Sequence, residues 1–364
     1  MNTDVLIIGG GPSGLAAATE LGERNLDVTI VDESYELGGQ LRQQTQPLEY
    51  LPTQYQNMRG FELAESLVKK VNQQSSSLRK FLNHRVIGLY KDGSVGISDG
   101  QKIFAVKAKK IIVATGAYEK AIPFLKWTLP GIMTIGAAQT LINRELVLPG
   151  RETVIIGISD FTLDVVSQLQ DVGITVKGIV VPKETKSPFN CEQLSRVVAS
   201  GVTVYQNAIV IEAKGNGQVE ELMIKHDEKL MNFQVDFVCL DGGRAPVLDV
   251  FYQLNCSFGY REALGGWLPQ YDANFRTSEE NIYIAGSASG ISNHGVVLLT
   301  GMIAGISVGE ELKMIEQEEA QFIRNSLWKE VEVLESKGSP MVWEERKLHI
   351  NHFSQPMIKD QFIS

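Results

Sequence analysis

The chain has 364 residues, 43% of them hydrophobic, and 34 basic against 43 acidic residues give a net charge of −9. This length predicts about two domains with ordinary cores, and an acidic balance without any basic block argues against nucleic acid as a partner. The three cysteines (Cys191, Cys239 and Cys256) form no Cys-x-x-Cys pair, which argues against a redox dithiol, a zinc site or a cysteine-bound cluster.

The beginning of the chain and its hydropathy predict a cytoplasmic protein. A strand-like run begins within a few residues of Met1, which leaves no room for a signal peptide. No apolar run reaches the ~18–20 residues that a transmembrane helix needs, so we expect no transmembrane segment. Any membrane association is expected to be peripheral, through partner proteins.

The first forty residues have the pattern of a dinucleotide-binding unit. An apolar run, VLII, leads into the turn GGGPSG, a helix-like run follows, and a second apolar run ends in an acid. In this pattern Gly9 turns the chain off the strand, Gly11 lets the backbone approach a pyrophosphate, and Gly14 lets the helix pack closely. The helix N-terminus offers N–H groups to the phosphates. The ribose would be held by Asp32, with Glu33 as the alternative.

The next segment predicts a loop, a helix and a small antiparallel sheet. Residues 41–60 are polar and rich in turn residues, whereas residues 61–74 have one apolar face and predict a helix. Three short alternating runs between residues 85 and 107 are separated by Asp-Gly pairs, which are typical of hairpins. A buried strand, Ile111 to Ala114, then opens into Thr115-Gly116.

Several separated motifs resemble one class of flavoprotein. A second glycine-bearing strand end after a meander is similar to the glutathione-reductase-like proteins with two dinucleotide domains. The stretches GGQLRQQTQP, MRGFELAESL, AIPFLKWTLPGIMTIGAAQTLIN and GGWLPQYDANFRTS resemble the FAD-bearing α subunits of dye-linked proline and hydroxyproline dehydrogenases, opine oxidases and hydrogen cyanide synthase. The resemblance implies an α/β fold with two Rossmann-like domains, each with a small antiparallel meander, and FAD as cofactor.

The same resemblance implies three segments of the chain. Residues 1–118 and 246–312 would form the FAD-binding domain, residues 119–245 an inserted NAD(P)-like domain, and residues 313–364 a C-terminal helical extension. In relatives a cysteine-rich iron–sulfur segment often follows this region, and the extension contains no cysteine. A cluster would therefore have to come from another subunit, or there would be none.

The inserted domain carries a degenerate glycine pattern. A strand, a turn at Gly157 and a helix at about 161–171 repeat the first unit, but Ser159 and Thr162 occupy the other two glycine positions. A Cβ at the second position, Ser159, blocks the approach of the backbone to a pyrophosphate, and Asp160 adds negative charge. We expect a structural domain without a nicotinamide site. The alternative is an altered site for ATP or a regulatory adenylate, as the resemblance allows, with Lys183 or Lys186 on the phosphates. Residues 201–240 alternate and predict the second small sheet.

The return to the FAD domain departs from the class at one position. A strand ending at Ala285 leads to Gly286, and Ser287 stands where the class has an aspartate for the ribityl and pyrophosphate oxygens. A neutral hydrogen bond in place of a charge-assisted one is expected to weaken FAD binding about tenfold to a hundredfold at most. The helix that follows begins near His294, which would lie at the pyrimidine edge of the flavin or, alternatively, cap the helix at the surface.

The predicted site residues follow from these patterns. No catalytic residue other than His294 is assigned, and the histidine spacing indicates no metal site; His349 and His352 are expected at the surface. The residues predicted to bind the cofactor are Gly9, Gly11, Pro12, Ser13, Gly14, Asp32, Glu33, Gly39, Gln40, Val86, Ala114, Thr115, Gly116, Gly286 and Ser287.

The predicted function is that of an FAD-containing oxidoreductase. The resemblance implies the electron-transferring α subunit of a hetero-oligomeric dehydrogenase for amino or imino acids of the proline, hydroxyproline or opine type. Its partners would be a β flavoprotein subunit together with a small iron–sulfur subunit. Two alternatives are a self-sufficient NAD(P)H-dependent flavin oxidoreductase and a non-catalytic structural subunit whose nucleotide sites have decayed at Ser287 and Ser159.

Overall fold

The structure is a computed structural model that describes residues 1–74, 78–90, 92–183 and 191–353. The chain forms two compact units, one of residues Met1–Tyr118 and Ala245–Ser364, and one of residues Glu119–Arg244. It passes between them through β7 (Ala117–Glu119) and β15 (Arg244–Pro246), which pair in a two-stranded sheet. The expected α/β class with two Rossmann-like sheets and antiparallel meanders is confirmed.

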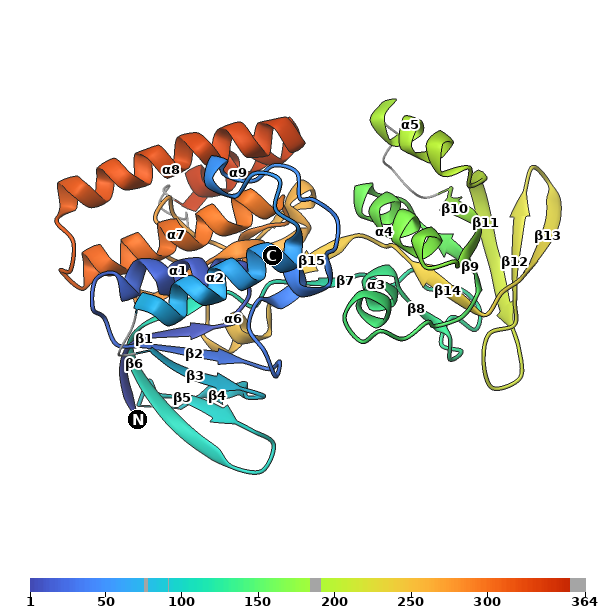
Figure 1. The fold of residues 1–364 in the computed structure, drawn as a ribbon. Helices are drawn as coiled ribbons and strands as arrows, with labels where there is room; N and C mark the ends of the chain where they lie inside the picture. Colours follow the sequence, from blue (N-terminus) through green and yellow to red (C-terminus); the bar gives the residue numbers. More distant parts are fainter. Residues whose placement is uncertain (75–77, 91, 184–190, 354–364) are drawn as a thin grey trace, which may run out of the picture. The chain divides into compact units, whose positions relative to one another are not determined.

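The first unit is built on a seven-stranded sheet with β1 near its centre. Along the sheet the strands run in the order β3, β2, β1, β6, β5, β4, and β18 pairs with β6 (Figure 1). Val5, Leu6 and Ile7 are fully buried, because both faces of β1 are covered. The strands are β1 (Asn2–Ile8), β2 (Val28–Asp32), β3 (Leu78–Leu82), β4 (Arg85–Leu89), β5 (Val95–Ser98), β6 (Ile103–Val113) and β18 (Ile282–Ile284).

The long strand β6 corrects one expectation. The sequence predicts a short hairpin strand at 103–107 and a separate buried strand from Ile111, but Ile103–Val113 is one continuous strand. Its first half pairs antiparallel with β5, and its second half pairs parallel with β1 and β18. The meander is therefore an extension of the parallel sheet. Strand β3 was not predicted from the sequence.

Helices cover the sheet of the first unit. Figure 1 shows α1, α7 and α8 side by side, and glycines make the α1–α7 crossing close. A Cβ on Gly301 would lie 2.1 Å from the carbonyl oxygen of Ser13, so this position accepts only glycine without movement. The helices are α1 (Pro12–Gly22), α2 (Gly60–Gln74), α6 (Asp249–Gln253), α7 (His294–Glu311), α8 (Gln317–Gly338) and α9 (Pro340–Phe353), with 3₁₀ turns η1 (Gly39–Gln43), η2 (Thr53–Tyr55), η3 (Glu262–Leu264) and η4 (Gly286–Ser289). None of the described helices is long and apolar enough to cross a bilayer.

The last helix corrects the expected surface position of one histidine. His349 of α9 is 1% exposed, and its Nε2 lies 2.9 Å from the carbonyl oxygen of Pro269, next to the hairpin of β16 (Phe258–Arg261) and β17 (Gly266–Pro269). Its ring packs against Tyr271 at 4.7 Å. His352, one turn later, is exposed as expected. Burial lowers the pKa of His349 to about 4.

This histidine predicts a loss of stability in mild acid. Unfolding restores an ordinary pKa near 6.5, so between pH 6.5 and pH 4 the unfolded chain binds a proton that the folded chain excludes. The contribution of His349 to the free energy of unfolding should have its full value above pH 6.5, and the free energy should fall by at most about 3 kcal/mol as the pH drops to 4. Thermal unfolding of wild type and His349→Gln at pH 7.5, 6.5, 5.5 and 5 measures this. If both proteins lose stability equally over that range, other groups cause the acid sensitivity.

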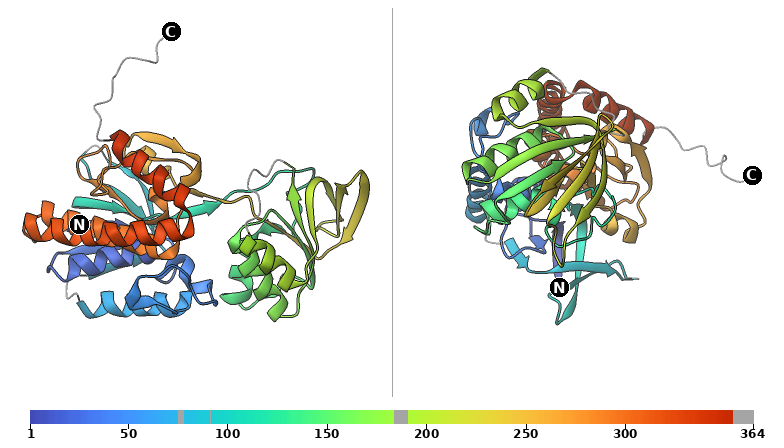
Figure 2. Two further views of the ribbon diagram at one scale, coloured as in Figure 1. Left: turned by 90° about the horizontal axis from the view of Figure 1, so that it is seen from above. Right: turned by 90° about the vertical axis from the view of Figure 1, so that its right-hand side faces the viewer.

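The second unit repeats the arrangement of parallel sheet and meander. Its strands run in the order β13, β12, β11, β10, β9, β14, β8, and the parallel part extends from β11 to β8. Its helices lie on one face of the sheet (Figure 2). The elements are β8 (Ile132–Thr134), α3 (Ile135–Asn143), β9 (Glu152–Ile156), α4 (Asp160–Asp171), β10 (Thr175–Pro182), α5 (Cys191–Ser200), β11 (Val204–Lys214), β12 (Glu221–His226), β13 (Lys229–Gln234) and β14 (Phe237–Leu240).

Candidate functional site

The candidate site lies at the carboxyl ends of the parallel strands in the first unit. From β1 the chain continues to β2 on one side of the sheet, whereas β6 pairs with β1 on the other side. Open α/β sheets bind ligands at such a switch point, outside the carboxyl ends of the strands. Four segments meet there: the glycine turn after β1, the turn at 38–40, the end of β6, and η4 after β18. Most of the predicted cofactor residues are on these segments.

The glycine turn separates packing positions from an open position. Gly9 has φ +106°, and a Cβ there would lie 2.3 Å from the carbonyl oxygen of Ala114; a Cβ on Gly14 would lie 2.0 Å from the carbonyl oxygen of Gly9. Both glycines are therefore required by the fold. Gly11 differs, because the nearest atom to its Cβ position is the Cα of Gly39, at 3.9 Å. The backbone at Gly11 is thus open to a ligand.

The N-terminus of α1 carries no internal cap. Gly11 is the N-cap residue and has no side chain, and Pro12 follows at the first helical position. No side-chain hydrogen bond from a described residue caps this helix. Its first N–H groups and the positive end of its dipole are therefore available to an anion. Ser13, behind the turn, is buried and faces Gly286.

The two acids at the end of β2, Asp32 and Glu33, have different surroundings. The carboxylate of Asp32 accepts hydrogen bonds from the backbone N–H of Gly10 at 2.6 Å and of Ser34 at 2.7 Å, so it lies against the glycine turn. Glu33 points to the surface, where it is 69% exposed and forms an ion pair with Arg85 at 3.2 Å. This geometry favours Asp32 over Glu33 as the residue next to a bound nucleotide.

Two further segments close around the turn. The N–H of Gly38 donates to the carbonyl oxygen of Gly10 at 2.9 Å, and this bond places Gly39 against Gly11. Gln40 is exposed and contacts Gln43.

The start of the meander also lies near Asp32. The N–H of His84 donates to the backbone carbonyl of Asp32 at 3.0 Å, which brings the beginning of β4, with Val86, to this end of β2. Just after β6, a Cβ on Gly116 would have nothing within 4 Å. The hydroxyl of Thr115 donates a hydrogen bond to the carbonyl oxygen of Val247 at 3.4 Å.

The return turn reaches the glycine turn directly. A Cβ on Gly286 would lie 2.3 Å from the hydroxyl of Ser13, and the N–H of Gly286 donates to Thr300 at 2.9 Å. The next residue, Ser287, is half-buried, and its hydroxyl has no hydrogen bond to another described residue. Among the described residues, the Ser287 hydroxyl is therefore uncommitted.

The start of α7 is capped by its own residues. His294 is its first residue and is half-buried; before it, the Asn293 side chain accepts a hydrogen bond from the N–H of Val296 at 3.0 Å. The N–H of Gly295 donates to the carbonyl of Tyr50 at 3.1 Å, so the polar loop before α2 contacts this helix end. The role of His294 stays a prediction.

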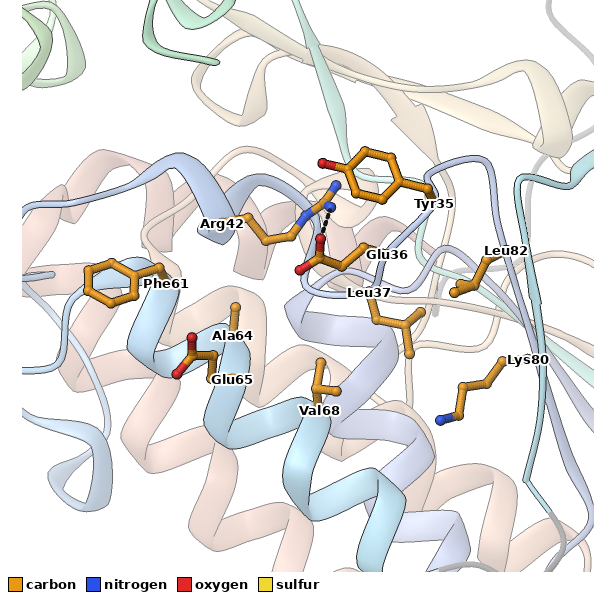
Figure 3. Close-up of a pocket in the computed structure, with 10 residues that line it drawn as sticks. All are labelled: Tyr35, Glu36, Leu37, Arg42, Phe61, Ala64, Glu65, Val68, Lys80 and Leu82. Atoms are coloured by element: carbon orange, nitrogen blue, oxygen red, sulfur yellow. Dashed lines mark ion pairs between the residues drawn. The ribbon is translucent and has the colours of Figure 1, made fainter. Parts of the chain in front are cut away.

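A pocket that the sequence did not indicate adjoins the acid end of β2. It has a volume of about 340 Å³ and lies between the loop after β2, helix α2 and the end of β3 (Figure 3). The Arg42 guanidinium lies 5.3 Å from the Tyr35 ring and pairs with Glu36 at 3.3 Å. The lining residues are Tyr35, Glu36, Leu37, Arg42, Phe61, Ala64, Glu65, Val68, Lys80 and Leu82. They come from separate segments, so no local motif marks them.

The corresponding turn of the second unit is closed by a carboxylate. Ser159 caps α4 by accepting from the N–H of Thr162 at 3.2 Å, and the hydroxyls of both residues donate to Oδ2 of Asp241. The other oxygen of Asp241 accepts from the N–H of Gly243 at 3.1 Å. The Ser159 hydroxyl thus caps the helix end where a pyrophosphate binds in an intact unit, and the Asp241 carboxylate lies against the hydroxyls of Ser159 and Thr162.

Of the two predicted lysines of the second unit, one lies among the described residues. Lys183 is exposed, and Lys186 lies outside the described residues. Asp241, which the sequence did not indicate, follows β14 and is 82 residues from Ser159.

The described thiols are not placed for disulfide chemistry. Cys239 and Cys256 are both free and buried. Burial raises the pKa of Cys239 to about 12 and that of Cys256 to about 11, so both thiols are protonated at neutral pH. Among the described residues, no group of three His, Cys, Asp or Glu side chains is arranged to hold a metal ion.

Comparisons with known proteins agree with this geometry. The chain is 27% identical over 350 residues to hydrogen cyanide synthase subunit HcnB of Pseudomonas aeruginosa, covering 88% of this chain and 74% of that protein. It is 25% identical over 325 residues to an opine oxidase subunit from Rhizobium meliloti, covering 84% and 70%. The resemblance indicated by the sequence motifs is thereby confirmed.

A solved structure and a family model complete the comparison. The L-proline dehydrogenase from P. horikoshii matches with a TM-score of 0.72 at 25% identity; the match covers 90% of this chain and 59% of that chain. The present chain therefore spans less than two thirds of that relative. The model of the family described as pyridine nucleotide-disulphide oxidoreductase matches residues 3–303. The protein belongs to this family and is an FAD-dependent oxidoreductase.

Proposed function

We propose that this protein binds FAD at the glycine turn of its first unit and transfers electrons as one component of a hetero-oligomeric enzyme. The substrate class would be an amino acid, imino acid or opine, oxidised at a C–N bond. The observation that carries the proposal is the contrast between two helix ends. The N-terminus of α1 is uncapped and open at Gly11, whereas the N-terminus of α4 is capped by the Ser159 hydroxyl, which in turn donates to Asp241.

The residues of the first unit fit the parts of an FAD molecule. The open backbone at Gly11 and the N–H groups of α1 suit the pyrophosphate, and Asp32 suits the adenosine ribose. The uncommitted hydroxyl of Ser287 would bind the ribityl–pyrophosphate part in place of the aspartate expected in this class. Bound FAD supplies the capacity to accept a hydride or two single electrons. The chain supplies binding, orientation and exclusion of water.

The relatives support a role within a larger complex. Two of them are named as subunits, of hydrogen cyanide synthase and of opine oxidase, and the similar solved structure is an L-proline dehydrogenase. We infer a partner flavoprotein subunit that oxidises the substrate, and a small iron–sulfur subunit that carries electrons further. Isolation of the native complex tests both, because each partner should co-purify with this chain.

The cofactor proposal is tested on the purified chain. We expect the purified chain to show the absorption bands of a flavin, and the flavin to be released on denaturation. After reconstitution, the chain should bind FAD tightly, with one FAD per chain. A colourless protein that FAD cannot reconstitute would refute the proposal and favour a structural subunit with decayed sites. The test does not depend on knowing the substrate.

The closed turn of the second unit predicts that NAD(P)H does not reduce the bound flavin. Asp241 would repel a pyrophosphate, and the hydroxyls of Ser159 and Thr162 are already engaged with it. Anaerobic mixing of the FAD-loaded chain with up to millimolar NADH or NADPH should leave the flavin spectrum unchanged, while dithionite bleaches it. Rapid bleaching by NADH would instead identify a self-sufficient NAD(P)H-dependent oxidoreductase. Isothermal titration with ATP tests the remaining nucleotide, and we expect no binding to the second unit.

A further inference from the structure

The C-terminal helices contact the return turn through a fully buried arginine. Arg346 of α9 is 0% exposed, and its Nε and Nη2 donate to the two carboxylate oxygens of Glu335 at 2.8 and 2.9 Å. Its Nη1 donates to the hydroxyl oxygen of Tyr271 at 2.8 Å and to the carbonyl oxygen of Ser289 at 2.9 Å. The Tyr271 hydroxyl donates to the same carbonyl at 2.7 Å. Two buried donors therefore hold one backbone oxygen.

That oxygen belongs to the turn that approaches the glycine turn. Ser289 is the last residue of η4, which begins at Gly286 and contains Ser287. Within η4 the Ser289 hydroxyl donates to the carbonyl of Gly286 at 2.7 Å, so the turn is a small rigid unit. Fixing its far end at Ser289 also fixes the direction in which Ser287 is presented.

A second tether acts on the next element along the chain. The side chain of Asn293 donates to the carbonyl oxygen of Leu334 in α8 at 2.9 Å, while its oxygen caps α7. A Cβ on Gly295 would lie 2.7 Å from the Leu334 side chain, so the two helices touch closely at this point. Leu334 immediately precedes Glu335, the partner of Arg346. Both tethers therefore converge on residues 286–295.

Stability alone does not account for a charged pair at this place. A buried ion pair carries a large desolvation cost, and apolar residues of similar volume often stabilise a fold as well or better. A planar guanidinium, however, can hold a carboxylate on one side and a carbonyl on the other in a fixed geometry. The arrangement of Glu335, Arg346 and Ser289 uses both sides of the group.

We propose that Arg346 is a positioning residue of the FAD site, which acts through Ser289 to orient the η4 turn and Ser287. The inference rests on the proposed FAD function of this unit. According to this proposal, the affinity for FAD depends on α8 and α9, the two helices that follow the FAD-binding elements in the sequence. It assigns no contact between Arg346 and the cofactor itself.

The test compares two double variants in the same helical layer. Glu335→Leu/Arg346→Met removes the pair that reaches Ser289. The matched control, Glu310→Leu/Arg324→Met, removes another ion pair of a buried arginine, between α7 and α8, which makes no hydrogen bond to residues 286–295. Circular dichroism and thermal unfolding establish that each apoprotein is folded, and FAD titration followed by flavin fluorescence gives the Kd.

The expected result is about a tenfold higher Kd for FAD in Glu335→Leu/Arg346→Met and less than a twofold change in the control. Equal affinity in wild type and Glu335→Leu/Arg346→Met would overturn the inference and leave the FAD proposal intact. Failure of the wild type to bind FAD would instead refute the FAD proposal.

A conservative variant decides the question if the first double variant does not fold. Arg346→Lys keeps the charge but cannot bind Glu335 and Ser289 with one rigid group. We expect a folded apoprotein whose Kd for FAD is raised about three- to tenfold. A folded Arg346→Lys protein with the wild-type Kd would contradict the positioning role.

Discussion

Replacing Gly11 with valine should abolish FAD binding and leave the chain folded. The Cβ position of Gly11 has no atom closer than 3.9 Å, and its φ of −75° is allowed for any residue, so the backbone accepts a Cβ there without movement. The added side chain would occupy the open space in which a pyrophosphate must approach the backbone. We expect the Kd for FAD to rise more than a hundredfold, with the melting temperature of the apoprotein within a few degrees of wild type.

A matched substitution controls for the loss of a glycine. Gly88 of β4 also has open space around its Cβ position, with nothing within 4 Å, and lies on the edge strand of the meander. Gly88→Val should bind FAD like the wild type. Visible absorbance after reconstitution and desalting distinguishes the two variants. If Gly11→Val retains FAD, the cofactor does not bind at the glycine turn.

Replacing Gly301 with alanine should destabilise the first unit strongly. The new Cβ would lie 2.1 Å from the oxygen and 2.8 Å from the carbonyl carbon of Ser13, and these are backbone atoms that cannot rotate away. Helix α7 would have to move off α1, at a cost of about 2–3 kcal/mol. Because Ser13 belongs to the glycine turn, the movement should also weaken FAD binding.

The same helix offers its own control. A Cβ on Gly309 would lie 3.2 Å from the Arg24 side chain and 3.7 Å from the Ile315 side chain, and no backbone atom is among these neighbours, so Gly309→Ala should stay within about 1 kcal/mol of the wild type. Urea unfolding of both apoproteins measures the difference. If Gly301→Ala is no less stable than Gly309→Ala, the tight α1–α7 crossing is not a determinant of stability.

The parts of the fold that depend on local pattern could be predicted from the sequence. The glycine turn, the acid after β2 and the strand–helix–strand spacing are all encoded within forty residues, and the structure has these elements. The prediction of two strands in place of β6 has a physical cause. Lys107 and Lys109 are exposed where the strand passes from the meander into the buried sheet, and this change of pattern resembles an interruption.

The parts that depend on distant contacts could not be predicted. Ser159 and Thr162 look like simple losses of glycine until Asp241 is seen to accept hydrogen bonds from both. His349 lies in a polar helix, and only the packing of Tyr271 and the carbonyl of Pro269 shows why it is buried. The hydropathy pattern of one segment contains no information on which side chains of a distant segment will contact it.

The carboxylate of Asp241 is held by the fold next to the hydroxyls of Ser159 and Thr162, which it binds. A free nucleotide that needs the hydroxyls of Ser159 and Thr162 competes with this carboxylate, whose effective concentration is set by the fold and not by the cell. The second unit is therefore expected to keep its shape whatever the nucleotide level, whereas the stability of the first unit should rise with the FAD supply. Within one chain, one copy of the architecture would then respond to the nucleotide supply, whereas the other copy would serve as a fixed scaffold that does not respond.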